Sequence, residues 1–153
     1  MKFRVPPPIL AFATAMLMWW LDRRLPGPRL LSTPWSRIGL GLIGIGVIID
    51  AIAVAGFLRA RTTVNPMRVD RASKLVVAGL YSWSRNPMYL GLLLALTGWG
   101  AILGSFTPLL AIVGFERVLV FLQIGPEERA LANKFGAAYA AYCARVFRWI
   151  GRR

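Results

Sequence analysis

Residues 84–91, with the sequence Ser-Arg-Asn-Pro-Met-Tyr-Leu-Gly, are a polar segment at the start of a long apolar stretch. Asn is favoured as a helix N-cap and Pro at the first helical position, so a helix is predicted to begin at Asn86 and Pro87. A helix start offers free N–H groups and a partial positive charge. Arg85 adds a guanidinium that can bind a carboxylate through two hydrogen bonds. The segment therefore predicts a site for an anionic ligand group, with simple helix capping as the alternative.

A second polar cluster, Pro126-Glu127-Glu128, lies at the matching end of the next apolar stretch. Glu127 and Glu128 are two of only six acidic residues in the chain. They could bind hydroxyl groups or an amine of a ligand, or accept a proton. Acids in a first helical turn also stabilise the helix dipole by about 0.3–1 kcal/mol, which is the structural alternative. Together the two clusters predict one site on one side of a membrane.

The residue inventory limits the chemistry. The chain has no histidine and one cysteine, Cys143, which we interpret as a packing residue. A disulfide within the chain is therefore impossible, and no metal site is expected because His and Cys are the usual zinc ligands. Nucleophilic catalysis by Ser-His-Asp or Cys-His groups is also excluded.

Composition and hydropathy define the elements that must position these groups. The 153 residues are 57% hydrophobic with a mean hydropathy of +0.57, which is typical of an integral membrane protein. The apolar stretches predict an all-α fold in one domain, 1–153, with about four transmembrane helices and a C-terminal cytoplasmic amphipathic helix. The predicted spans are 5–21, 38–58, 87–103 and 108–124, and the C-terminal helix is predicted at 126–150, with a bend at Gly136.

Charge distribution predicts the orientation. With four spans, fourteen Lys and Arg residues lie on one side, and only Arg23, Arg24, Arg29 and Arg37 lie on the other. The positive-inside rule then places both termini, the loop near 59–86 and both polar clusters in the cytoplasm. We expect the membrane to be the plasma (inner) membrane of a bacterium. The net charge of +13 favours contact with anionic membrane lipids, and no nucleic-acid partner is expected.

Two features inside the predicted spans have structural interpretations. Residues 39–44 (Gly-Leu-Gly-Leu-Ile-Gly) match a dinucleotide-binding pattern, but they lie at the start of a membrane helix and indicate a small-residue packing face. Asp50 and Arg117 are charged residues at similar depth, so we expect an ion pair between them. The alternative for Asp50 is the floor of a substrate cavity.

Four motifs in order resemble one enzyme group. They are Val76-Val77-x-Gly79-Leu80-Tyr81, the segment 84–91, Glu127-Glu128-x-x-Leu131, and Phe135-Gly136-x-x-Tyr139-x-x-Tyr142. The set resembles the integral-membrane methyltransferases of the isoprenylcysteine carboxyl methyltransferase and phospholipid methyltransferase group, over residues 60–150. The chain differs from the isoprenylcysteine enzymes at Asn86, where they usually have His.

The resemblance implies S-adenosylmethionine as the methyl donor, bound near the cytoplasmic face. It implies that Leu75, Val76, Gly79 and Tyr81 lie along the adenosine, and that Arg85, Asn86, Pro87 and Tyr89 surround the polar end of the donor. Glu127 and Glu128 would complete the pocket, with Tyr139 and Tyr142 as its cover. Arg85, Glu127 and Glu128 are the residues expected to align the reactants for catalysis.

The sequence therefore predicts transfer of a methyl group to a lipophilic carboxylate, amine or thiol that enters from the bilayer. Two other classes remain open at this point. One is a membrane reductase with NADPH as its cofactor, and the other is a non-catalytic scaffold whose basic loops bind lipid. The reductase would need a broader phosphate-binding surface than Arg85 alone offers.

Overall fold

The computed structural model describes residues 5–25, 27–59 and 74–153 of the chain. Five α-helices make up most of these residues: α1 (Pro7–Arg24), α2 (Ile38–Arg59), α3 (Pro87–Leu103), α4 (Thr107–Leu119) and α5 (Gly125–Arg145). In the described residues, extended pairing is limited to two isolated bridges, Arg29 with Ser105 and Val146 with Arg152. The prediction of an all-helical fold is thus confirmed. Of the cations used to predict orientation, Lys2, Arg4, Arg61, Arg68 and Arg71 lie outside the described residues.

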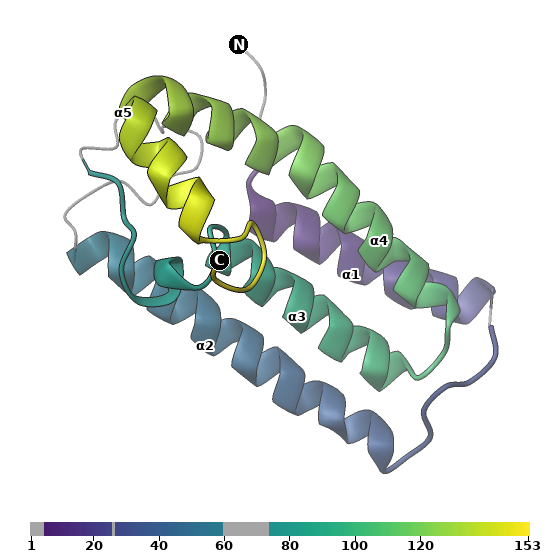
Figure 1. The fold of residues 1–153 in the computed structure, drawn as a ribbon. Helices are drawn as coiled ribbons and strands as arrows, with labels where there is room; N and C mark the ends of the chain where they lie inside the picture. The colour runs from purple at the N-terminus through teal and green to yellow at the C-terminus, as the bar shows by residue number, and fades with distance from the viewer. Residues whose placement is uncertain (1–4, 26, 60–73) are drawn as a thin grey trace.

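The helices α1 to α4 run alongside one another, and α5 folds back over the end of the bundle where α3 begins (Figure 1). The main core cluster joins Met18 of α1, Leu96 of α3 and Leu119 of α4. Many large apolar side chains on the outside remain exposed, among them Phe12 at 70% and Phe121 at 79%. Such an apolar exterior is suited to lipid rather than to water.

Two stretches of helix in the described residues are long and apolar enough to cross a membrane, Trp35–Arg59 and Thr107–Arg145. The helix α3 is equally apolar but has 17 residues, and it begins and ends where the sequence predicted. The first helix starts at Pro7 and continues to Arg24, three residues beyond the predicted end. Four complete spans therefore remain a prediction.

The interface between α2 and α3, the most extensive between two helices in the described part of the chain, depends on glycine. A Cβ added at Gly46 would lie 2.6 Å from the carbonyl oxygen of Gly91, and one at Gly39 would collide with the carbonyl oxygen of Gly98. The predicted packing face in 39–44 is thus only partly correct, because a Cβ added at Gly41 or Gly44 would meet nothing within 4 Å beyond the backbone of its own helix. Since Gly39 and Gly46 are seven residues apart, they share one helix face, whereas Gly41 and Gly44 do not lie on it.

This interface gives a stability prediction. Replacing Gly46 with alanine should lower the free energy of unfolding by about 1–3 kcal/mol, because the added methyl group forces α2 and α3 apart. Gly44→Ala on the same helix is the matched control, and it should be neutral or stabilising by up to about 1 kcal/mol. Thermal unfolding of both variants in detergent measures the difference. Equal stability of the two would show that α2 and α3 do not pack at Gly46.

The expected ion pair between Asp50 and Arg117 does not form. Arg117 is 81% exposed, and its Nε lies 3.4 Å from Oε2 of the neighbouring Glu116. Asp50 instead lies against Gly91 of α3, where a Cβ would collide with its Oδ1 atom. This oxygen is buried without a hydrogen-bond partner among the described residues. The prediction was wrong because equal depth does not place two residues on facing helix surfaces.

The fourth predicted span and the C-terminal helix are joined without a break. A π-helical turn, Val120–Ile124, connects α4 to α5, and the N–H of Gly125 donates to the carbonyl of Val120. Pro126 has no N–H and would break an ordinary α-helix. The wider π turn next to it is where the helix adapts. Farther along, Gly136 has φ 49° and ψ −120°, so the predicted bend at this residue is confirmed.

The C-terminal helix ends at Arg145, five residues before the predicted end. Val146 is extended, and the chain after it turns back on itself through a hydrogen bond from the Phe147 N–H to the Gly151 carbonyl. This tail also pairs with the loop before α3, through the N–H of Arg85 to the Phe147 carbonyl at 3.1 Å. The sequence prediction of helix through residue 150 was wrong because these long-range hydrogen bonds favour an extended backbone.

Candidate functional site

The candidate site lies where the start of α3, the first turns of α5 and the C-terminal tail meet (Figure 1). Asn86 is the N-cap residue of α3, but its side chain makes no capping hydrogen bond. Its Nδ2 atom instead donates to the Arg148 carbonyl at 3.1 Å, and its backbone N–H donates to Ser84 Oγ at 3.0 Å. The capping alternative for the Asn86 side chain therefore does not apply, because this side chain holds the tail.

Arg85 and Glu128 meet across 43 positions of sequence. Nη1 of Arg85 lies 3.2 Å from Oε1 of Glu128, and it also donates to Sγ of Cys143 at 2.8 Å. Both charged side chains are largely buried, with 16% and 17% exposed. The Nε atom of Arg85 is buried with no hydrogen-bond partner among the described residues. A buried N–H of a cation without a partner is costly, so this atom is suited to an acceptor supplied by a ligand.

Glu127 is joined to the start of α3 as well. The hydroxyl of Tyr89 donates to Oε1 of Glu127 at 2.6 Å. Each acid of the Glu127-Glu128 pair thus contacts a different residue of the segment 84–91. The two polar clusters predicted from sequence form one continuous cluster in the structure.

Arg148 is a member of this cluster that the sequence did not indicate. Its Nε and Nη2 atoms bind the two oxygens of Glu128 at 3.1 and 2.6 Å, a bidentate ion pair. These hydrogen bonds raise the pKa of Arg148 above its usual range. The residue was missed because a helix through residue 150 placed it among the solvent-facing cations of an amphipathic surface. No local signal marks a residue that reaches its partner through a turned-back tail.

The predicted adenosine and cover residues lie beside the cluster. The Tyr142 hydroxyl donates to the Tyr81 carbonyl at 2.6 Å, and the Tyr81 ring packs edge-on against Phe57 of α2, 5.1 Å between centroids. Tyr139 and Tyr142 are buried in a small apolar cluster that includes Leu75.

Three other residues predicted for the site, Val76, Gly79 and Pro87, are described by their burial or backbone conformation. Val76 is half-buried and Pro87 is fully buried in the first turn of α3. Gly79 has φ +64°, a conformation that favours glycine, at the start of the short turn Gly79–Ser82. The structure thus brings Leu75, Tyr81, Tyr139 and Tyr142 together. Val76 and Gly79 lie between Leu75 and Tyr81 in the loop before α3.

The cluster contains both positively and negatively charged side chains, and they are mostly buried. Arg85 and Arg148 supply two guanidinium groups, and Glu127 and Glu128 supply two carboxylates, beside apolar aromatic side chains. Such a cluster can bind a ligand that carries both a carboxylate and an ammonium group. Among the described residues no group of three or more His, Cys, Asp or Glu residues is placed to hold a metal.

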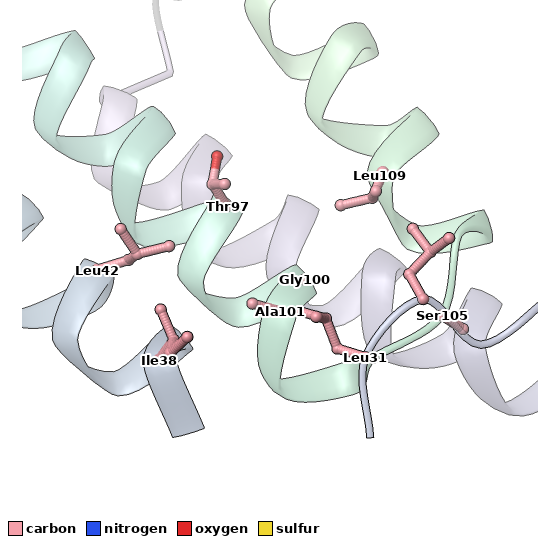
Figure 2. Close-up of a pocket in the computed structure, with 10 residues that line it drawn as sticks. Leu31, Ile38, Leu42, Thr97, Gly100, Ala101, Ser105 and Leu109 are labelled. Atoms are coloured by element: carbon pink, nitrogen blue, oxygen red, sulfur yellow. The ribbon is translucent and has the colours of Figure 1, made fainter. Parts of the chain in front are cut away.

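A separate cavity of about 290 Å³ lies at the other end of α3 (Figure 2). It is lined by Leu31, Leu42, Thr97, Gly100 and Leu109 with other small or apolar residues, and no charged residue lines it. A cavity of this kind does not suit a charged ligand. The polar cluster at the start of α3 is therefore the candidate functional site.

Comparison with known proteins decides the family. A model of the phospholipid methyltransferase family matches residues 35–138, more than half of the chain. The chain belongs to this family. The match covers Arg85, Glu127 and Glu128 and ends before Tyr139 and Arg148.

Three relatives of this family member extend the comparison. A probable protein-S-isoprenylcysteine O-methyltransferase of rice (Oryza sativa subsp. indica) is 33% identical over 143 residues, 90% of this chain and 72% of the relative. Protein-S-isoprenylcysteine O-methyltransferase B of Arabidopsis thaliana is 33% identical over 113 residues, 72% of this chain and 56% of the relative. An uncharacterised protein of Haemophilus influenzae is 41% identical over 63 residues, 41% of this chain and 100% of the relative.

These findings confirm the resemblance drawn from the four motifs. The phospholipid methyltransferase family member described here is an enzyme for methyl transfer and a membrane protein. The reductase and scaffold alternatives do not agree with this membership.

Proposed function

We propose that the enzyme binds S-adenosylmethionine at the cluster of Arg85, Glu127, Glu128 and Tyr89 and transfers its methyl group to a lipophilic acceptor. The observation that carries the proposal is the meeting of these side chains at the start of α3. The buried Nε of Arg85, which has no partner among the described residues, is the polar atom that a donor carboxylate would satisfy.

The two ends of the cluster fit the two charges of the donor's amino-acid part. Arg85 would bind the carboxylate, with the free N–H groups of the α3 start beside it. Glu127 would bind the ammonium group, and Tyr89 would hold Glu127 in place through its 2.6 Å hydrogen bond. Asn86 and Pro87 would fix the helix start that carries these groups.

The adenosine would lie along the loop before α3. Leu75, Val76, Gly79 and Tyr81 would contact it, and Tyr139 and Tyr142 would cover it. The apolar cluster of Tyr139, Tyr142 and Leu75 supports this arrangement because it gives an aromatic and aliphatic surface beside the charged groups. Burial raises the pKa of Tyr81, so its hydroxyl stays protonated.

When bound, the donor supplies a methyl group on a sulfonium, which an acceptor lone pair displaces in line while the carbon–sulfur bond breaks and a neutral thioether leaves. This reaction depends on the alignment and desolvation of the reactants more than on a strong base. An enzyme without histidine can therefore carry it out. Arg85, Glu127 and Glu128 would serve by alignment.

The acceptor would enter laterally from the bilayer. A lipophilic carboxylate, amine or thiol is compatible with the apolar exterior. The family is named for phospholipids, and the two plant relatives are named for isoprenylcysteine. The excess of cations on one side supports a cytoplasmic location for the site and both termini. The plasma (inner) membrane of a bacterium is the host membrane in this proposal.

Transfer of tritium from labelled donor tests the activity. The purified enzyme in lipid nanodiscs would be given a farnesylated cysteine derivative in one reaction and phosphatidylethanolamine in another. We expect labelled lipid product with at least one acceptor, and at least tenfold less product from an Arg85→Ala variant when the donor concentration is well below its dissociation constant. Product from neither acceptor, with donor binding intact, would reject both acceptor classes.

A further inference from the structure

Two arginines, Arg148 and Arg85, contact the same carboxylate, that of Glu128. Glu128 accepts two hydrogen bonds from Arg148, at 3.1 and 2.6 Å, and one contact of 3.2 Å from Arg85. The bidentate pair is therefore with Arg148, while Arg85 touches Glu128 through a single nitrogen. The Nε of Arg85 is left buried without a partner among the described residues.

The same residue also fixes the start of α3. The Arg148 carbonyl accepts the Asn86 side chain at 3.1 Å, and the preceding Phe147 carbonyl accepts the Arg85 N–H at 3.1 Å. The C-terminal tail is thus hydrogen-bonded to both Arg85 and Asn86. The side chain of Arg148 is 39% exposed, so it lies at the rim of the cluster rather than in its interior.

The contact of both arginines with Glu128 determines how much positive charge is available to a ligand. Arg85, Arg148 and Glu128 together carry a net charge of +1, which leaves one positive charge for a ligand carboxylate. Without Arg148, Glu128 and Arg85 would form a neutral pair, and the planar guanidinium of Arg85 would turn to bind Glu128 with two hydrogen bonds. Its Nε would then be occupied by the protein's own acid.

We propose that Arg148 is a positioning residue for donor binding, which holds Glu128 through its bidentate ion pair and so keeps Arg85 available for the carboxylate of the donor. The inference rests on the proposed function, because it assigns Arg85 to the donor carboxylate. Arg148 itself does not contact the donor.

The test compares two ligands that differ in the carboxylate. S-Adenosylhomocysteine has the amino-acid end, and 5′-methylthioadenosine lacks it. Arg148→Gln should weaken binding of the former about tenfold by calorimetry and change binding of the latter by less than about twofold. Arg145→Gln is the matched control, since the Arg145 side chain is exposed and its Nε donates to the Ala141 carbonyl of its own helix at 3.3 Å. It should change neither affinity.

A double-mutant cycle with Glu128→Gln separates positioning from a general loss of structure. Arg148→Gln should cost about tenfold in the wild-type background and almost nothing in the Glu128→Gln background, where residue 128 has no charge with which to bind Arg85. An equal loss for both ligands, or an equal loss in both backgrounds, would overturn the positioning role. Wild-type protein that binds neither ligand would overturn the proposed function instead, whereas binding by wild type that Arg148→Gln leaves unchanged would overturn this inference alone.

Discussion

Replacing Arg85 with alanine is expected to weaken binding of S-adenosylhomocysteine by at least tenfold, about 1.4 kcal/mol. The guanidinium is the buried cation whose Nε has no partner among the described residues, and no other group at the start of α3 can bind a carboxylate through two hydrogen bonds. Calorimetric titration of the detergent-purified variant measures the loss. The loss should be smaller for 5′-methylthioadenosine, which has no carboxylate.

Arg129→Ala is the control for this experiment. Arg129 follows Glu128 directly but is exposed to solvent, so its removal changes the local charge by the same amount. It should leave the affinity within about twofold, because exposed charges interact weakly with a buried ligand. An unchanged affinity in a folded Arg85→Ala variant would remove Arg85 from the donor site.

Replacing Glu127 with glutamine should weaken S-adenosylhomocysteine binding by about tenfold or more, because the carboxylate that would bind the ammonium group loses its charge. The shape of the side chain is kept, so the fold should survive. Tyr89→Phe removes only the hydroxyl that holds Glu127 at 2.6 Å, and it should cost about threefold to fivefold.

The order of these two losses identifies the role of each residue. Titration of both variants with S-adenosylhomocysteine at one pH gives the comparison. If Tyr89→Phe costs more than Glu127→Gln, the hydroxyl itself contacts the donor and Glu127 only orients it.

Much of the fold was predictable because its signals are local. The Asn-Pro start of α3, its end at Leu103 and the bend at Gly136 each depend on residues that act on their own backbone. The glycine face of α2 was only partly predictable, since the pairing of Gly46 with Gly91 depends on how two helices face each other. The Asp50–Arg117 pair failed for the same reason.

The residues of the site also differ in whether local sequence signals predict them. Arg85, Tyr89, Glu127 and Glu128 are polar residues at the ends of apolar stretches, and this setting identified them as candidates from the sequence. In the structure Arg85 contacts Glu128 and Tyr89 contacts Glu127. Arg148 had no such signal. It enters the cluster only because the tail leaves the helix after Arg145 and turns toward the loop before α3, an event determined by hydrogen bonds between residues more than 60 positions apart.

Donor binding by the wild-type enzyme can be measured in detergent by a pair of calorimetric titrations, one with S-adenosylhomocysteine and one with NADPH. We expect saturable binding of S-adenosylhomocysteine at micromolar concentration and no binding of NADPH. If the well-folded enzyme fails to bind S-adenosylhomocysteine, or binds NADPH in its place, the cluster at the start of α3 is not a site for S-adenosylmethionine.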